Sequence, residues 1–337
     1  MTKLEKVITA FRKRITSGEF KLGERIPSEY DLAETYGINK STANKAVAAL
    51  VTEGYLYRGK RGSGTYIVRT SVYPAGIIAV IGEFSHSYYA KISKGVISAA
   101  ENENYMVAFF SPNADLLNET INKIKSSNIQ GIITFCYGEL SLLPEDMPVI
   151  YVDKQFPAGD VHNRVNNNEY QGGCLQAETL LKHGHRNIVY YTPVSSPRNE
   201  GFMDTLKKNS IADAENRVFY GSLTMPHCIN TLRKIYSTFP EVTAIACYSD
   251  NDAFRLIKAA KQIDSDFLRR ISLVGFGNVK EITDIYNLTT IEQHPHELGF
   301  DAFQYLLEMI EGKRQTTHLN VEIDVELIHG MSISHVF

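Results

Sequence analysis

The sequence predicts a mixed α/β protein in which a small head of three helices and a β-hairpin precedes a larger body of two lobes. Three observations lead to this prediction. Apolar residues recur at helical spacing through the first 54 residues, and two short strand-like stretches follow them. Beyond residue 76, apolar runs of strand length alternate with helical segments, which is typical of parallel sheets covered by helices. This alternation occurs in two successive series, each long enough to form its own parallel sheet.

Composition and charge narrow the class of protein. The chain has 337 residues, of which 43% are hydrophobic and 22% charged, as in a globular protein of two or three domains. Charges interrupt the apolar residues at the N-terminus, so we expect no signal peptide, and no apolar run reaches the length of about 18 residues that spans a membrane. The four cysteines are far apart and form no CxxC motif. We therefore expect a cytoplasmic protein with reduced thiols.

Charge is distributed unevenly along the chain. Residues 1–70 carry 13 Lys and Arg against 7 Asp and Glu, a net charge of +6. The remaining residues carry 22 basic against 31 acidic side chains, a net charge of −9. A basic head on an acidic body suggests that the head binds an anion and the body does not.

Each of the three helices in the head is expected to begin at a capping residue and to end at a glycine. The three caps are Thr2, Ser28 and Asn39, and the three glycines are Gly18, Gly37 and Gly54. The third helix follows the second after a tight turn, as in helix-turn-helix motifs. Opposite its apolar face it carries Lys40, Ser41, Asn44, Lys45 and Ala48. Such side chains suit a helix that enters a DNA groove, although a solvated surface would look the same.

The stretch after the third helix favours DNA binding. Two short strands, 55–58 and 65–68, are joined by a loop in which Lys60 and Arg61 stand beside glycines. A cationic hairpin tip of this kind can approach a phosphate backbone or enter a minor groove. Three helices and a basic hairpin make a winged helix.

Residues 1–68 resemble the DNA-binding head of the GntR family of bacterial transcription regulators. The matching segments are "SGEFKLGERIPSEYDLA", "YGINKSTANKAV", "LVTEGYLYR" and "GSGTYIV". The resemblance implies that operator DNA is contacted by Ser28, Tyr30, Lys40, Ser41, Thr42, Asn44, Lys45, Lys60, Arg61 and Gly62. The family usually has arginine where this chain has Tyr30, Lys40 and Asn44. We therefore expect fewer bidentate contacts with guanine and more contact with adenine.

In the body, polar and aromatic residues follow the predicted strands. They are Ser85, Tyr88, Tyr89, Asp153, Arg198, Ser249 and Asp250. Ligands of open parallel sheets bind beyond the carboxyl ends of the strands, and between two lobes that place is a cleft. Aromatic faces with a few fixed hydrogen-bonding groups suit a neutral polyol. Taken singly, Ser85, Ser249 and Asp250 could equally be helix caps.

Residues 77–333 resemble the effector domain of the LacI/GalR repressors, which share the fold of periplasmic sugar-binding proteins. The matches include "IIAVIGEFSHSYYAKISKGVISAAENENYMV", "PVIYVDKQF", "RNEGF", "TAIACYSDNDAFRLIKAAKQ", "ISLVGFGN" and "LTTIEQHPHELG". The resemblance implies that the seven strand-end residues line a ligand pocket, with Asp153 near the hinge and Arg198 on a ligand hydroxyl. Ser249 stands where the family often has a ligand-binding Asn. Gly277 stands where it usually has Asp, which leaves room for a modified sugar.

From these patterns we expect a winged-helix domain over 1–68, a linker over 69–76 and an effector domain over 77–337. Lobe 1 is expected over about 77–160 and 294–320, and lobe 2 over about 161–293 and 321–337. The linker is short, contains Pro74 and lacks the hinge helix of the LacI family. A GntR-type head on a LacI-type body is also the arrangement of the arabinose repressors of bacilli, although the pocket residues do not point to arabinose.

The predicted function is a ligand-responsive transcription repressor. It would bind a palindromic operator in double-stranded DNA as a homodimer and be released by a small sugar or sugar derivative between its lobes. The alternatives are an effector that is a purine, nucleoside or sugar phosphate, and a corepressor-type regulator with a protein partner. We expect no enzyme, cofactor, metal site or membrane contact, because no nucleophile–base pairing, catalytic carboxylate pair or metal-ligand spacing is found.

Overall fold

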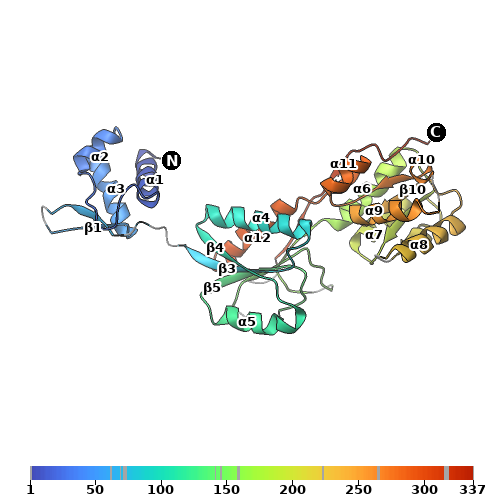
Figure 1. The fold of residues 1–337 in the computed structure, drawn as a ribbon, viewed down its shortest axis with the longest axis horizontal. Helices are drawn as coiled ribbons and strands as arrows, with labels where there is room; N and C mark the ends of the chain where they lie inside the picture. The colour runs from blue at the N-terminus through green and yellow to red at the C-terminus, as the bar shows by residue number, and fades with distance from the viewer. Residues whose placement is uncertain are drawn as a thin grey trace. The chain divides into compact units, whose positions relative to one another are not determined.

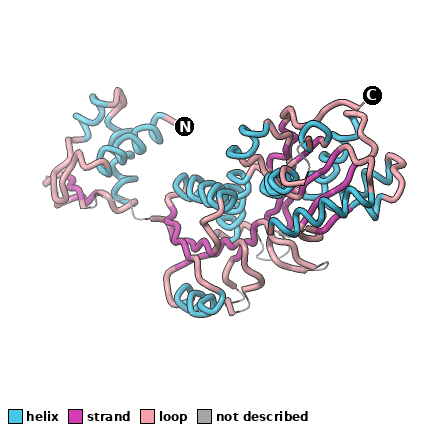
Figure 2. Tube along the Cα trace, turned by 45° about the vertical axis from the view of Figure 1, so that its right-hand side comes forward, coloured by secondary structure: helices cyan, strands magenta, loops and turns pink. Residues whose placement is uncertain are grey.

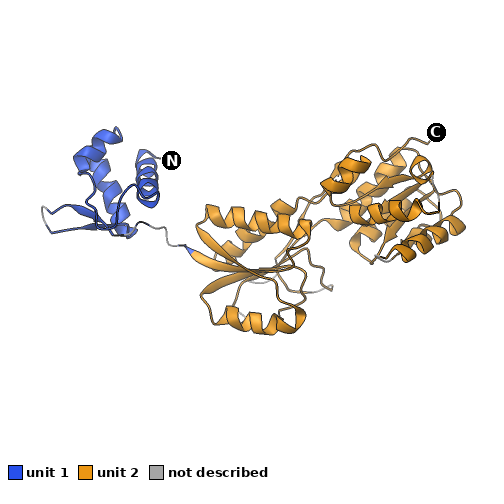
Figure 3. Ribbon diagram, viewed as in Figure 1, with its two compact units in different colours: residues 1–75 blue, residues 76–337 orange. Residues whose placement is uncertain are grey.

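The computed structural model describes residues 2–60, 63–68, 70, 74–140, 142–144, 146–157, 160–221, 224–263, 266–314 and 319–336. The chain forms two compact units, residues 1–75 and residues 76–337 (Figure 3). No helix among the described residues is long and apolar enough to cross a bilayer.

The first unit is the predicted winged helix. Its helices are α1 (Lys3–Thr16), α2 (Glu29–Thr35) and α3 (Lys40–Thr52), and its hairpin pairs β1 (Leu56–Arg58) antiparallel with β2 (Thr65–Ile67). The caps are confirmed, because the side chains of Thr2, Ser28 and Asn39 each accept a hydrogen bond from the backbone N–H three residues later. Apolar residues of all three helices and the hairpin, among them Phe11, Leu50 and Ile67, form one buried core.

The base of the hairpin depends on a glycine. Gly64 has a φ of +99°, and a Cβ atom there would lie 2.3 Å from Nε of Arg25. Any larger residue would be strained at this φ and would require the Arg25 side chain to move. Arg61 and Gly62, which were predicted to contact DNA, lie outside the described residues, as does much of the predicted linker 69–76.

The first lobe of the second unit contains a six-stranded parallel sheet with strand order β13-β7-β6-β5-β3-β4. Its strands are β3 (Gly76–Ile81), β4 (Tyr105–Phe110), β5 (Ile129–Thr134), β6 (Val149–Val152), β7 (Arg164–Asn167) and β13 (Asn320–Ile323). Its helices are α4 (Ser87–Asn102), α5 (Leu117–Lys125) and α12 (Pro295–Ile310), with a short turn η1 (Ala114–Leu116). Ile78 and Val80 pack towards α4 and α12, whereas Ala79 and Ile81 pack towards α5 (Figure 1). Both faces of the sheet are therefore covered, which explains its continuous apolar strands.

The second lobe contains a four-stranded parallel sheet with strand order β11-β10-β8-β9. Its strands are β8 (Ile188–Thr192), β9 (Val218–Tyr220), β10 (Ala244–Cys247) and β11 (Ser272–Val274). Its helices are α6 (Glu169–Lys182), α7 (Pro197–Lys208), α8 (Met225–Thr238), α9 (Asp250–Ala260), α10 (Phe267–Arg270) and α11 (Lys280–Tyr286), with a turn η2 (Ala214–Arg217). One buried cluster joins the sheet to α6 and α7, and another joins it to α8 and α9, so helices lie on both faces (Figure 2).

Two of the expected lobe boundaries differ from the structure. β7 and β13 belong to the first sheet, although the sequence division near residues 160 and 320 places them in the second lobe. β7 has the sequence "RVNN", which lacks an apolar run, yet it is paired on both sides and three of its four residues are buried. Beyond this sheet, β12 (Thr290–Glu292) pairs antiparallel with β14 (Glu326–Ile328) as a separate ribbon.

Candidate functional site

The head contains a polar groove between α2, α3 and the hairpin, with a volume of about 830 Å³. Its charged and polar lining residues are Arg25, Ser28, Glu29, Lys40, Asn44, Arg58, Lys60 and Thr65. Four of the predicted DNA-binding residues are therefore brought together here, namely Ser28, Lys40, Asn44 and Lys60. Two further predicted residues, Ser41 and Lys45, are exposed on α3.

Tyr30 near the start of α2 and Lys40 at the start of α3 form a pair. Nζ of Lys40 lies 3.9 Å from the centre of the Tyr30 ring, a cation–π contact. Tyr30 is 67% exposed, which leaves most of the ring free to meet a partner. Tyr30 and Lys40 both stand where the GntR family usually has arginine. In this chain the Tyr30 ring therefore contacts the Lys40 ammonium group.

Glu29 connects α3 to the hairpin. Its Oε1 accepts hydrogen bonds from Nδ2 of Asn44 at 3.0 Å and from Nη2 of Arg58 at 3.1 Å. This arrangement limits the rotation of the Asn44 amide and offsets one positive charge in the groove. Sequence reasoning missed Glu29, Arg58 and Arg25; the position of Arg58 at the end of a hairpin strand was the available signal.

Two predicted DNA-binding residues have local partners. The Ser28 hydroxyl donates to Oδ2 of Asp31 at 2.7 Å, and hydrogen bonds from the Ser28 side chain and backbone lower the pKa of Asp31. The Thr42 hydroxyl donates to Oδ1 of Asn39 at 2.9 Å. Both side chains thus take part in helix caps, and any contact with DNA would have to share their hydroxyls.

The body contains a cavity of about 200 Å³ between its two lobes. It is lined by His86, Tyr88, Asp153, Arg198, Tyr248, Ser249, Asn251, Phe276, Gly277, Val279 and Gln293. A dry cavity of about 150 Å³ holds a benzene molecule, so this space is suited to one substituted six-membered ring. Of the seven predicted ligand-binding residues, Tyr88, Asp153, Arg198 and Ser249 meet here.

Arg198 is fixed on every side. Its Nη1 donates to the Tyr248 carbonyl oxygen at 2.7 Å, and its Nη2 forms an ion pair with Oε1 of Glu169, also at 2.7 Å. The guanidinium lies 4.3 Å from the centre of the Tyr248 ring and 3.7 Å from that of Phe276. Its Nε is buried and has no hydrogen-bond partner. Two of the five N–H donors of Arg198 are therefore committed to the protein itself.

Asp153 follows β6 with a φ of +53°, in the left-handed region that Asp tolerates better than most residues. The pKa of its half-buried carboxyl is raised to about 6, first by burial and then by the charge of Glu169. Arg198 and hydrogen bonds with Tyr88 and Asn167 lower this pKa but do not reverse the rise.

Tyr88 is held by two amide groups, one from Asn167 at the end of β7 and one from Gln293 between β12 and α12. Its hydroxyl accepts a hydrogen bond from Nδ2 of Asn167 at 2.7 Å and a long one from Nε2 of Gln293 at 3.4 Å. Burial raises its pKa well above the ordinary value, so the hydroxyl stays protonated and can donate. Tyr88 therefore links α4 to the end of β7 and to the segment between β12 and α12.

Three predicted ligand-binding residues do not line the cavity. Ser85 is exposed, and its backbone N–H donates to Oε1 of Glu83. Tyr89 stacks on Phe135 with ring centres 5.1 Å apart. Asp250 is fully buried, where its carboxylate accepts hydrogen bonds from the Thr290 hydroxyl and the Val279 N–H.

Sequence reasoning missed five lining residues that carry chemistry: His86, Tyr248, Asn251, Phe276 and Gln293. Tyr248 and Asn251 flank the predicted Ser249 and Asp250, and Phe276 precedes Gly277, so proximity to a predicted strand end was the available signal. Gln293 lies between β12 and α12, where no strand-end rule applies.

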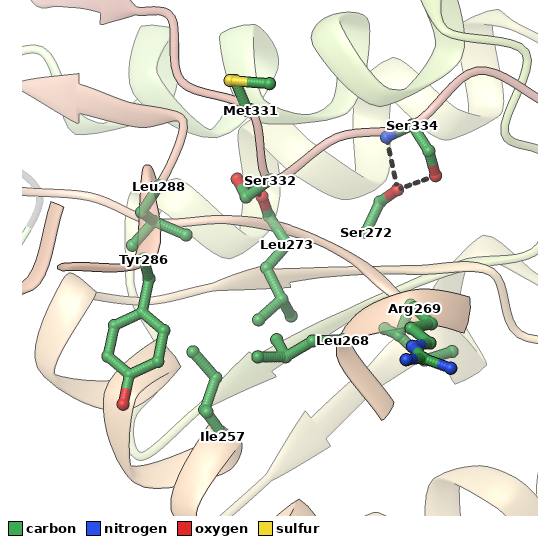
Figure 4. Close-up of a pocket in the computed structure, with 11 residues that line it drawn as sticks. Ile257, Leu268, Arg269, Ser272, Leu273, Tyr286, Leu288, Met331, Ser332 and Ser334 are labelled. Carbon is green, nitrogen blue, oxygen red and sulfur yellow. Dashed lines mark hydrogen bonds between the residues drawn. The ribbon is translucent and has the colours of Figure 1, made fainter. Parts of the chain in front are cut away.

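A second cavity, of about 170 Å³, lies in lobe 2 beside the edge strand β11 (Figure 4). Its lining combines apolar residues, among them Ile257 and Leu268, with Arg269 and three serines. Its serines bond to the chain itself, since the Ser334 backbone N–H donates to the Ser272 hydroxyl at 3.0 Å. This cavity offers a ligand no convergent set of charged groups, so the cavity between the lobes is the better candidate for a binding site.

Comparison with known proteins matches the two units to two families of regulator. A family described as periplasmic binding proteins and sugar binding domain of LacI family matches residues 74–330. A family described as bacterial regulatory proteins, gntR family, matches residues 3–67.

Individual relatives are regulators of transcription. The HTH-type transcriptional repressor PurR of Klebsiella pneumoniae is 27% identical over 273 residues, which cover 77% of this chain and 79% of its own. An arabinose metabolism transcriptional repressor of Halalkalibacterium halodurans is 25% identical over 344 residues, which cover 93% of this chain and 91% of its own. The solved cellobiose complex of the transcriptional regulator CelR has a TM-score of 0.67 at 16% identity, covering 91% of this chain and 100% of that one, and shows the shared fold.

Proposed function

Because the chain belongs to the family of periplasmic binding proteins and LacI-type sugar-binding domains and carries a GntR-type head, we propose that it is a repressor released from DNA by a sugar-like ligand. It is a ligand-responsive DNA-binding regulator of transcription. The observation that carries the proposal is that one chain contains both a groove with cationic lining residues in a winged helix and a partly enclosed cavity lined by Asp153 and Arg198.

The operator is proposed to be a palindrome bound by a homodimer, because a two-fold symmetric protein matches a two-fold symmetric site. Lys40, Asn44, Arg58 and Lys60 would meet the DNA, with the lysines and Arg58 on phosphates and Asn44 on a base edge. The protein would act in the cytoplasm, where its operator is.

The ligand is proposed to be a small sugar or sugar derivative. A cavity of about 200 Å³ with aromatic walls and fixed polar groups supports this. The cellobiose complex of CelR and the name of the arabinose repressor point to the same class. The similarity to PurR keeps a purine or nucleoside as the second candidate.

Ligand binding would favour closure of the lobes and thereby change the geometry of the dimer that presents the two heads. The response cannot exceed the difference in ligand affinity between the two states, typically about 1–3 kcal/mol. Tyr88, Asn167 and Gln293 stand where that closure would be sensed.

The test selects an operator from random duplex DNA with the purified full-length protein, and then screens ligands by thermal shift. A neutral sugar should raise the melting temperature and weaken operator binding measured by fluorescence anisotropy. Purine bases and nucleosides form a second arm of the same screen, and their success would establish the alternative. If no compound of either arm raises the melting temperature, the ligand-binding role of the cavity is refuted.

Two variants separate the two activities. Lys40→Ala with Asn44→Ala should abolish operator binding and leave the melting temperature and ligand response intact. Arg198→Ala should retain operator binding and lose the ligand response. Operator binding by the first variant would remove α3 from its proposed role.

A further inference from the structure

We propose that the cavity selects its ligand by charge: it takes a neutral or amine-bearing sugar with a donor group facing Asp153, and it rejects phosphorylated and other anionic sugars. This inference rests on the proposed function and names the class of ligand. It also decides against the sugar phosphate that the sequence left open.

The positive charge at the cavity is already balanced. Arg198 forms its ion pair with Glu169 at 2.7 Å, and the two side chains are 6% and 9% exposed. Its Nη1 also donates to the Tyr248 carbonyl oxygen. A phosphate that displaced Glu169 from Arg198 would leave a buried carboxylate without a partner.

The negative charge of Asp153 is not balanced. Among the described residues, no cation forms an ion pair with Asp153, and the repulsion by Glu169 outweighs the attraction by Arg198. The ring of His86 also lines the cavity, and its Nδ1 accepts a hydrogen bond from the Tyr88 N–H at 3.3 Å. Asp153, Glu169 and Arg198 together therefore carry one net negative charge.

The partial positive charges at the starts of α9, α6 and α4 do not reverse the negative sign of the charge at the cavity. A helix start attracts anions, but α9 carries Asp250 and Asp252 in its first turn, and its cap Ser249 accepts from the Asp252 N–H. α6 carries Glu169 in its first turn, the same carboxylate that pairs with Arg198. At α4 the ring of His86 accepts a hydrogen bond from the Tyr88 N–H. Charges and caps of the chain itself thus occupy the starts of α9, α6 and α4.

The net negative charge acts on a ligand in a partly enclosed space, where charge interactions are stronger than in water. A phosphate would face the Asp153 carboxylate without a free cation. A hydroxyl can donate to Asp153 and accept from Nε of Arg198. An ammonium group would add an ion pair, so an amino sugar should bind more tightly than the parent sugar.

The experiment uses full-length protein and matched probes: glucose, galactose, cellobiose and arabinose, with glucosamine, galactosamine, glucose 6-phosphate and galactose 6-phosphate. Binding is measured by thermal shift and titration calorimetry at pH 7.5. For the scaffold that binds, we expect the phosphate to bind at least tenfold more weakly than the parent, and the amine to bind at least as tightly. A phosphate that binds as tightly as its parent would overturn the inference and leave the proposed function standing. No binding by any probe would count against the proposed function itself.

Asp153→Asn removes the unbalanced charge and keeps the size of the side chain. The ratio of parent to phosphate affinity should fall several-fold, and the advantage of the amine should vanish. Glu119→Gln removes an equal charge from an exposed pair with Lys123 outside the cavity lining and should leave both ratios unchanged. Unchanged ratios in Asp153→Asn would overturn the inference.

A second readout needs no ligand. A carboxylate that is charged, half-buried and unbalanced destabilises the folded state, so Asp153→Asn should raise the melting temperature more at pH 8 than at pH 5. The titratable and charged groups that interact with Asp153 are Glu169, Arg198, Tyr88, Tyr89, Cys136 and Tyr248. The same pH comparison in Glu119→Gln is the control. An equal change at both pH values would contradict the unbalanced charge.

Discussion

Arg198 and Glu169 form an ion pair that is buried on both sides, with Nη2 of the arginine 2.7 Å from Oε1 of the glutamate. The pair joins the first turn of α7 to the first turn of α6, and both helices present it to the cavity between the lobes. The ion pair therefore affects both the stability of lobe 2 and the net charge of the ligand site.

Glu169→Ala should lower the free energy of unfolding by about 3 kcal/mol, because removal of one partner leaves a buried charge unpaired. The matched control is Glu119→Ala, which breaks an ion pair whose side chains are 60% and 67% exposed. That loss should be much smaller, because water screens an exposed ion pair. Urea denaturation measures both, and equal losses would mean that burial adds nothing to the Arg198 pair.

Gly173→Ala should disturb the ligand site without changing any lining residue. An added Cβ at Gly173 would lie 2.0 Å from the carbonyl oxygen of Arg198, so α6 and α7 would have to separate. We expect a loss of about 1–3 kcal/mol in stability and a smaller thermal shift with ligand. Gly138→Ala is the control, since its Cβ would meet nothing within 4 Å. Wild-type stability and thermal shift in Gly173→Ala would refute the close approach of the helices.

Asp250 should make the body less stable as the pH rises through the range from about 4 to 6. Burial raises the pKa of this carboxyl to about 6, against the hydrogen bonds from Thr290 and Val279 that lower it, and Glu292 adds to the rise. The folded state therefore binds more protons than the unfolded state in this range, and stability falls with rising pH. Relative to wild type, Asp250→Asn should gain up to about 2 kcal/mol between pH 4.5 and pH 7 in urea denaturation. A pH-independent difference would contradict the raised pKa.

Glu29→Ala should change how the head reads DNA. Without Glu29, the Asn44 amide and the Arg58 guanidinium lose a shared partner, and the groove gains one net positive charge. Binding to random duplex DNA should strengthen, and discrimination between operator and random DNA should fall. Glu53→Ala, which frees Arg12 from an ion pair outside the groove lining, is the control of equal charge. If both variants behave alike in anisotropy titrations, net charge rather than Asn44 positioning explains the effect.

Tyr30→Ala should weaken operator binding by releasing the Lys40 ammonium group, and Tyr30→Phe should retain most of the affinity. A cation–π contact at an exposed site is worth about 0.5–1 kcal/mol, or two- to fivefold in affinity. The salt dependence of binding should persist in both variants, because Lys40 keeps its charge. Equal losses in both would show that the Tyr30 hydroxyl, rather than the ring face, makes the contact.

Much of the fold could be predicted because it depends on neighbouring residues. The caps at Thr2, Ser28 and Asn39 depend on a side chain three residues from its partner. The strands of both sheets showed as apolar runs because helices cover both faces. β7 escaped prediction because its pairing with β6 and β13 stabilises a polar stretch that shows no strand pattern of its own.

The sequence by itself determined the class of each unit, the strand ends that point to the cavity, and the surface of α3 that faces a groove. Only the tertiary structure decided which charges remain for a ligand. Glu169 balances Arg198, Asp250 is buried, and Asp153 forms no ion pair with a cation in the part of the chain that the structure describes. The physical reason is that ion pairing and burial depend on distances between elements far apart in the chain, such as α6 and α7. No local pattern of residues records those distances.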